Sequence, residues 1–233
     1  MTDYKIRMSR RAQRARIVVR ADGSVEVVVP LGLDALFVPR WVASQRSWID
    51  KARARIQRRT SKAIEEPERL PETICLPMLG EELRVYYRPS ELPSVRCKVK
   101  DDGLHVSGPL DDTMAVREAL QTWLKKQARS CLPDRLQYLA ETHGFRVGDV
   151  SIRLQKSRWG SCSARGNISL NAKLLLLPSA LVDHVLLHEL AHIRHMNHSD
   201  AFWGLLGKLD SQCVQHRKQL RHAMHILPGW VQR

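Results

Sequence analysis

The sequence has few cysteines and no long apolar run. Its 233 residues include only five cysteines, an odd number, and no two of them are spaced as C-x-x-C. That pattern argues against a disulfide framework and a cysteine-based zinc site, and it fits a reducing, cytoplasmic compartment. The longest apolar stretches, near 174–177 and 185–187, are far too short to span a bilayer. The charged N-terminus is not typical of a secretory signal, so we expect a cytoplasmic protein with no membrane segment.

Positive charge, in contrast, is abundant. The formal net charge is +14, the sequence pI is about 10.1, and hydrophobic residues make up 43% of the chain. The apolar share is enough for a real core and argues against wholesale disorder. A basic surplus of this size favours nucleic acid, nucleotides or acidic substrates as partners, although a solvated basic surface would account for it equally simply.

Strand and helix signals along the chain predict an α+β protein in two parts. Residues 1–110 read as a β-rich N-terminal domain, with a hairpin over 14–29 and one long basic helix over 41–59 that could hold phosphates. A polar connection at 60–72 and several short strand candidates follow.

Residues 111–233 have a different character and read as an α+β catalytic domain. A helix is expected over 112–142, with Pro133 as a break or kink. Strand candidates at 150–155 and 167–171 flank a loop, and the clearest helix signal covers 179–196.

That last helix carries the motif with chemical meaning, H-E-x-x-H, at His188, Glu189 and His192. Successive helical residues are rotated by about 100°, so the two histidines lie one turn apart on one face and can bind the same ion. Glu189 is placed to take a proton from a water molecule that a zinc ion activates. The flanking residues are apolar, as expected of a buried helix in which metal coordination would satisfy the polar groups.

A third ligand can be sought by elimination. No glutamate follows Glu189, which excludes the arrangement with a downstream glutamate ligand. The remaining candidates are His195, His198, Asp200, Asp210, His216, His222 and His225. His195 is seven residues from the first ligand, about 10 Å along a helix, and one ion cannot bridge that distance. His198 comes within reach if the helix ends near Asn197 in a left-handed conformation and Ser199 caps the next helix, so we favour His198.

The loop and strand before the motif offer substrate-binding candidates. Arg158 or Asn171 could polarise a substrate oxygen, and the neighbouring strand edge could pair with an extended peptide. No tyrosine follows Tyr138, so a downstream tyrosine cannot stabilise an oxyanion. The aromatic residues Phe202 and Trp203 are expected to pack rather than react.

The segments KSRWGSCSARGNISLN and LPSALVDHVLLHELAHIRHMNHSDAFW resemble the YgjP-like metal-dependent hydrolases, which are grouped with SprT-like and WLM-like zinc metallopeptidases. This resemblance implies a zincin-like catalytic domain, with His188, His192 and His198 as ligands of Zn²⁺ and Glu189 as the catalytic acid/base. Family members commonly carry an aromatic residue where this chain has His184.

Three functions follow, in order of preference. The first is a zinc metallopeptidase acting on a peptide or protein. The second is a metal-dependent nucleotide (UTP) pyrophosphatase, an activity that the resemblance also implies, with arginines such as Arg158 neutralising phosphates. The third is a nucleic-acid-binding module that uses the basic N-terminal region, which leaves the histidine cluster unexplained.

Overall fold

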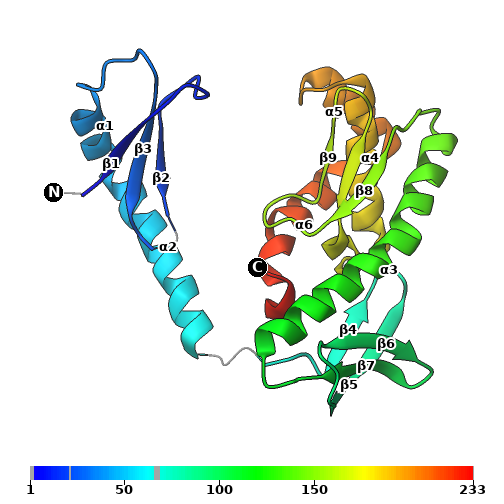
Figure 1. Cartoon of the computed structure of the whole chain (residues 1–233). Helices are drawn as coiled ribbons and strands as arrows, with labels where there is room; N and C mark the ends of the chain where they lie inside the picture. Colours follow the sequence, from blue (N-terminus) through cyan, green and yellow to red (C-terminus); the bar gives the residue numbers. More distant parts are fainter. Residues whose placement is uncertain (1–2, 21, 66–68, 233) are drawn as a thin grey trace. The chain divides into compact units, whose positions relative to one another are not determined.

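The computed structural model describes residues 3–20, 22–65 and 69–232 and confirms the α+β class (Figure 1). The chain forms two compact units, Met1–Arg69 and Leu70–Arg233. The sequence had placed a boundary near residue 110. The compact units divide earlier because the strands that follow Leu70 share one apolar core with the long helix that begins at Thr113.

The first unit is a three-stranded sheet with helices packed on one face. Its elements are β1 (Lys5–Ser9), β2 (Arg16–Val19), β3 (Val25–Pro30), α1 (Val38–Ser44) and α2 (Arg46–Glu65). The central strand, β3, runs parallel to β1 and antiparallel to β2. Alternate side chains of a strand share a face, and Val25, Val27 and Val29 are accordingly buried in one cluster with Val38 of α1 and Ile49 of α2.

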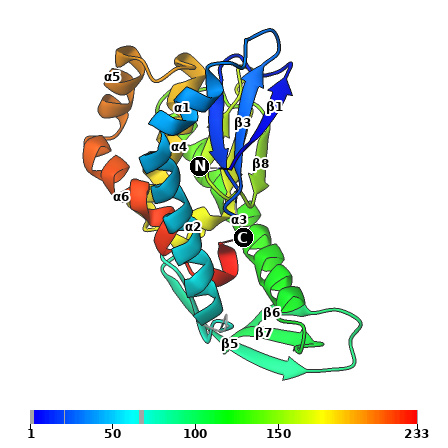
Figure 2. The same ribbon diagram turned by 90° about the vertical axis from the view of Figure 1, so that its left-hand side faces the viewer.

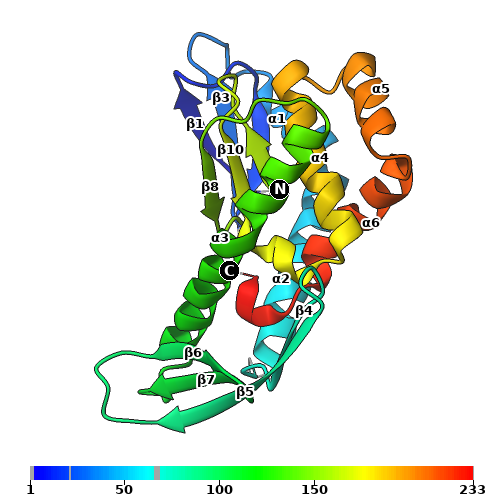
Figure 3. The same cartoon turned by 90° about the vertical axis from the view of Figure 1, so that its right-hand side faces the viewer.

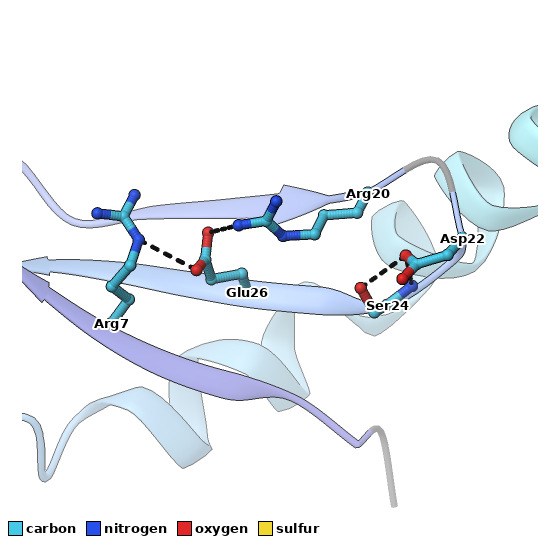
Figure 4. Close-up of polar contacts among 5 residues, drawn as sticks. All are labelled: Arg7, Arg20, Asp22, Ser24 and Glu26. Atoms are coloured by element: carbon cyan, nitrogen blue, oxygen red, sulfur yellow. Dashed lines mark hydrogen bonds and ion pairs between the residues drawn. The ribbon is translucent and has the colours of Figure 1, made fainter.

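The expected hairpin is confirmed as β2 and β3. Its turn is closed by a hydrogen bond from the Arg20 N–H to the Ser24 carbonyl, while residue 21 lies outside the described part of the chain. Figure 4 shows the carboxylate of Glu26 between Arg7 and Arg20, at 3.0 Å and 2.7 Å. These ion pairs join β3 to β1 and to the residue that directly follows β2.

The basic helix expected over 41–59 is present as α1 and α2, which meet at Gln45. Pro39 lies in the first turn of α1, where its missing N–H has no helical partner to lose. The side chains of residue 55 and residues 57–65 are outside the described part, as are residues 66–68 of the polar connection. Phosphate binding by this helix therefore stays a prediction.

The second unit contains two sheets and the remaining helices. Its strands are β4 (Thr73–Leu76), β5 (Glu81–Pro89), β6 (Arg96–Lys100), β7 (Gly103–Gly108), β8 (Val150–Arg153), β9 (Gly160–Cys162) and β10 (Ile168–Asn171). Its helices are α3 (Thr113–Thr142), α4 (Ser179–Arg194), α5 (Asp200–Leu209) and α6 (Cys213–Ile226), with short 3-10 turns at Ala172–Leu176 and Gly229–Val231.

The helix α3 links the two sheets. Asp112 caps its first turn by accepting hydrogen bonds from the N–H groups of Met114 and Ala115. The sheet ordered β4-β5-β7-β6 lies near the start of α3, as Figure 2 shows. Pro133 does not break the helix, which runs through this residue to Thr142, and the alternative of a kink there stays a prediction.

The second sheet and α4 form the part that carries the H-E-x-x-H motif. The sheet has the order β8-β10-β9, with β10 parallel to β8 and antiparallel to β9, so β9 is an edge strand. The motif helix, α4, contacts β9, α3, α5 and α6 (Figure 3). Its apolar residues Leu186 and Leu190 are fully buried in the main core.

Within the described residues, no helix is long and apolar enough to cross a membrane. All five cysteines are free thiols, as expected from their spacing. The cytoplasmic location stays a prediction.

Candidate metal centre

The helix α4 places two histidines side by side. His188 and His192 are one turn apart, and their ring centroids are separated by 4.8 Å. The Nδ1 atom of His192 lies 3.1 Å from the main-chain oxygen of His195. A carbonyl oxygen can only accept, so Nδ1 carries the proton and Nε2 is left with a lone pair for a metal ion.

His198 joins this pair from the loop between α4 and α5. Its Nε2 is 3.1 Å from the Nε2 of His188, and one ligand atom from each of the three histidines lies within 4.8 Å of the others. The chain leaves α4 at His195, which is extended, with φ −134° and ψ 97°. The prediction that Asn197 adopts a left-handed conformation is wrong, because no residue other than glycine has a positive φ in the described chain. Ser199 occupies the N-cap position of α5, as predicted, without a side-chain capping bond.

The spacing of these nitrogens fits a shared ion. Two nitrogens bound at about 2.0–2.1 Å to one tetrahedral ion lie about 3.3 Å apart, close to the 3.1 Å between His188 and His198. Burial, followed by the neighbouring imidazoles of His192 and His198, lowers the pKa of His188 to about 3. A neutral imidazole is the form that binds a metal, so the three side chains are a chemically suitable donor set.

Glu189 is buried beside the histidines and points at the edge strand. Its side chain lies against Gly160 of β9, where an added Cβ would fall 2.6 Å from Oε1. Its other oxygen, Oε2, is buried without a hydrogen-bond partner among the described residues. Burial raises the pKa of Glu189 to about 8, and the charge of Arg158 opposes that rise. A carboxyl group in this state is expected to bind a proton and a polar ligand readily.

The two predicted substrate-binding residues occupy different surroundings. Asn171 is fully buried, and its side-chain amide donates to the main-chain oxygens of Gln155, at 2.9 Å, and Arg158, at 2.6 Å. Its oxygen accepts from the N–H of Lys173. With its amide engaged inside the protein, Asn171 holds the loop before β9. Arg158 is exposed on that loop, within electrostatic reach of Glu189.

A second polar cluster, which the sequence did not reveal as a unit, joins His184 of the same helix to residues at the end of α5 and on α6. The Nδ1 atoms of His184 and His216 are 2.5 Å and 2.8 Å from the same oxygen, Oδ2 of Asp210. These are hydrogen-bond distances and are too short for two ligands of one tetrahedral ion. Asp210 and His216 were candidate third ligands, but they bind each other instead. Only their proximity after folding could have shown this.

Aromatic residues line the histidine cluster. Phe202 is fully buried, and its ring centroid lies 4.6–4.9 Å from those of His188, His192 and His198. Trp203 stacks on His198 at 5.5 Å, with an interplanar angle of 23°. Both contacts agree with the packing role expected for these residues. The histidines are thus held in place by α5 as well as α4.

Known proteins resemble this chain in sequence and in structure. A sequence model of the YgjP-like metallopeptidase domain matches residues 13–223. Among solved structures, the chain is similar to the metallopeptidase zymogen abylysin of Pyrococcus abyssi, with 24% identity over 40% of this chain and 94% of that one and a TM-score of 0.36. It is also similar to the zymogen jannalysin of Methanocaldococcus jannaschii, with 19% identity over 40% and 95% of the two chains and the same TM-score, 0.36.

These structural likenesses are too distant to support an argument about activity. No curated protein matches the chain significantly. The family match covers most of the chain, and it makes the protein a metal-dependent hydrolase. The chain belongs to the family of YgjP-like metallopeptidase domains.

Proposed function

We propose that the protein is a zinc-dependent peptidase in which His188, His192 and His198 hold the metal and Glu189 is the general base. The observation that carries this proposal is the convergence of three imidazole nitrogens beside a buried carboxyl group with an unpartnered oxygen. Three nitrogen ligands with an open fourth position are typical of catalytic zinc sites. A zinc ion bound there would polarise the substrate carbonyl and make a water molecule more acidic.

The residues of the chain supply the remaining steps. In the ionised form, Glu189 accepts the proton that water loses as it attacks the peptide carbonyl, and it then passes this proton to the leaving amine. Burial opposes ionisation of Glu189, but a divalent cation at the three histidines would favour it. Gly160 allows the carboxyl group to lie directly against β9, because any side chain there would displace it.

The edge strand β9 supports a peptide as the substrate. Among the described strands it pairs only with β10, so an extended chain could add to its other edge. Pairing along β9 would bring a substrate main chain next to Glu189. Arg158, on the loop held by Asn171, is our proposed contact for a substrate oxygen.

A pair of variants tests this proposal. The Glu189→Gln protein should keep about one zinc per chain but cleave an unfolded, fluorescently labelled protein at least about a hundredfold more slowly. The exposed Glu141→Gln is the matched control and should cleave normally. Zinc content is measured by atomic absorption after gel filtration. If Glu189→Gln cleaves as fast as the unchanged protein, Glu189 is not the base.

The other two activities gain no support from the fold. Enzymes that act on phosphates usually recruit Mg²⁺ through carboxylates, whereas this cluster consists of imidazoles. Hydrolysis of UTP that is equal in Glu189→Gln and the unchanged protein would show that any such activity lies outside this site. Salt-sensitive DNA binding that survives the same substitution would support a separate role for the basic N-terminal unit.

A further inference from the structure

One arginine is positioned beside the histidine cluster by an aromatic contact. The guanidinium carbon of Arg217, on α6, lies 4.1 Å from the ring centroid of Trp203. The same indole stacks on His198. Stacking on an aromatic ring orients a guanidinium group without using its N–H donors. Trp203 therefore contacts both Arg217 and the third proposed ligand.

Arg217 is exposed, and no ion pair or side-chain hydrogen bond involves it among the described residues. Asp210, which follows α5, accepts hydrogen bonds from two histidines instead. The planar fork of N–H donors on Arg217 is therefore available to a ligand, and its geometry matches a carboxylate.

One aromatic ring connects Arg217 to the proposed active site. The guanidinium carbon of Arg217 lies 4.1 Å from the ring centroid of Trp203, and the imidazole of His198 stacks on the same ring at 5.5 Å. Because the indole of Trp203 is the group that connects the arginine to the cluster, the guanidinium is placed to meet a part of the substrate next to the reacting carbonyl.

We propose that Arg217 is a specificity-determining residue, which binds a carboxylate of the peptide substrate close to the bond that is cleaved. This inference rests on the peptidase function proposed above. The carboxylate belongs either to an acidic side chain or to the C-terminus of a peptide. An acidic substrate also complements the net charge of +14 on the chain.

Binding can be measured separately from cleavage. The zinc-loaded Glu189→Gln chain is titrated with fluorescein-labelled decapeptides that carry one Asp-Glu pair, two serines or two lysines at their centre, each with a free or an amidated C-terminus. We expect the acidic peptide to bind at least about fivefold more tightly than the serine peptide, with a preference that weakens at high salt. If the preference depends instead on the free C-terminus, the C-terminal carboxylate is the group bound.

Charge reversal distinguishes recognition from a merely structural role. Arg217→Glu in the same background should reverse the preference, so that the lysine peptide binds more tightly than the acidic one. The matched control is Arg221→Glu, which changes the same charge one turn later on α6 and should leave the order of preference as it was. If all peptides bind equally, or if both reversals change the preference alike, the assignment to Arg217 is overturned.

Cleavage of the same peptides by the chain with Glu189 intact completes the test. A kcat/KM that is higher for the acidic peptide, with the difference mainly in KM, supports the inference. Cleavage of every peptide at one rate overturns the role of Arg217 but leaves the peptidase function standing. If no peptide is cleaved while the acidic preference in binding persists, the peptidase function fails and Arg217 remains a carboxylate-binding residue.

Discussion

The helix α4 takes part in two histidine clusters, of which only one contains a carboxylate. Around His188, three imidazoles converge with no carboxylate among them, and two of their nitrogens are 3.1 Å apart. One turn earlier, His184 meets His216 through Asp210, at 2.5 Å and 2.8 Å. In the second cluster a carboxylate accepts from both imidazoles, whereas the first consists of imidazoles alone, with the Nε2 atoms of His188 and His198 within hydrogen-bond distance of each other.

The difference shows that histidine proximity alone does not identify a metal site. A carboxylate that accepts a hydrogen bond from each imidazole satisfies the second cluster within the protein. No carboxylate accepts from the imidazoles of the first cluster among the described residues, and Glu189, which directly follows His188, has a buried oxygen without a partner there, so we propose that a metal ion completes this cluster. We therefore expect one metal ion per chain, at His188, His192 and His198.

The largest expected effect is on zinc binding, which should depend on the first cluster and not on the second. His198→Ala should weaken zinc binding by more than about a hundredfold, because even the partners that orient zinc ligands contribute 10- to 100-fold. His216→Ala should keep one zinc per chain. Competition with a fluorescent chelator measures both affinities. A zinc content that falls from two to one per chain in His216→Ala would contradict the assignment of the second cluster.

The second effect concerns stability. Asp210→Ala should lower the free energy of unfolding by about 2–4 kcal/mol, because the N–H groups of the buried His184 and the partly buried His216 lose their acceptor. The exposed Asp134→Ala is the control and should change it by less than about 0.5 kcal/mol. Urea unfolding, monitored by circular dichroism, measures both. Equal stability of the two variants would mean that the cluster does not stabilise the fold.

A smaller effect tests the contact between Gly160 and the side chain of Glu189. Gly160→Ala should cost about 1–3 kcal/mol of stability and at least about tenfold in peptide cleavage, because the new methyl group would overlap Glu189. Gly207→Ala, on α5, is the control, since a Cβ there meets nothing within 4 Å. Unfolding and cleavage assays are run on both. Normal cleavage by Gly160→Ala would show that Glu189 does not need its position against β9.

The smallest effect is a pH dependence that arises in the second cluster. Burial lowers the pKa of His184, although its hydrogen bond to Asp210 opposes the change. Below an unfolded pKa of about 6.5, the unfolded chain then takes up a proton more readily than the folded chain, so stability falls as the pH falls. Relative to His184→Phe, the unchanged protein should lose up to about 1.4 kcal/mol per pH unit below pH 6.5.

That comparison uses metal-free protein and urea unfolding at pH 7.5, 6.5 and 5.5. Groups outside the second cluster, including Glu189 with its raised pKa, affect both proteins alike and leave the difference between them unchanged. Asp210 contributes only at lower pH. Burial raises the pKa of Asp210, but hydrogen bonds from His216 and His184 outweigh burial, so the pKa is lowered. Its contribution to stability is therefore lost only when the pH falls below the usual pKa of an aspartate. A difference that grows in favour of the unchanged protein as the pH falls would contradict the assignment.

The sequence alone determined the features that depend on neighbours along the chain. The H-E-x-x-H spacing placed His188 and His192 on one face of a helix, and turn residues and β-branched runs predicted the hairpin of the first unit. These features follow from the helical repeat and from local backbone preferences, which act over a few residues. The absence of glutamates after Glu189 narrowed the choice of the third metal ligand. The prediction that a left-handed Asn197 ends the helix was wrong.

Only the tertiary structure decided which distant groups meet. It buried the amide of Asn171 beneath the loop of Arg158, joined Asp210 to two histidines and placed Arg217 on Trp203. It also joined the strands after Leu70 to the core of α3 rather than to the first unit. Such contacts depend on how helices and sheets pack, because residues far apart in sequence become neighbours only when apolar faces are buried together.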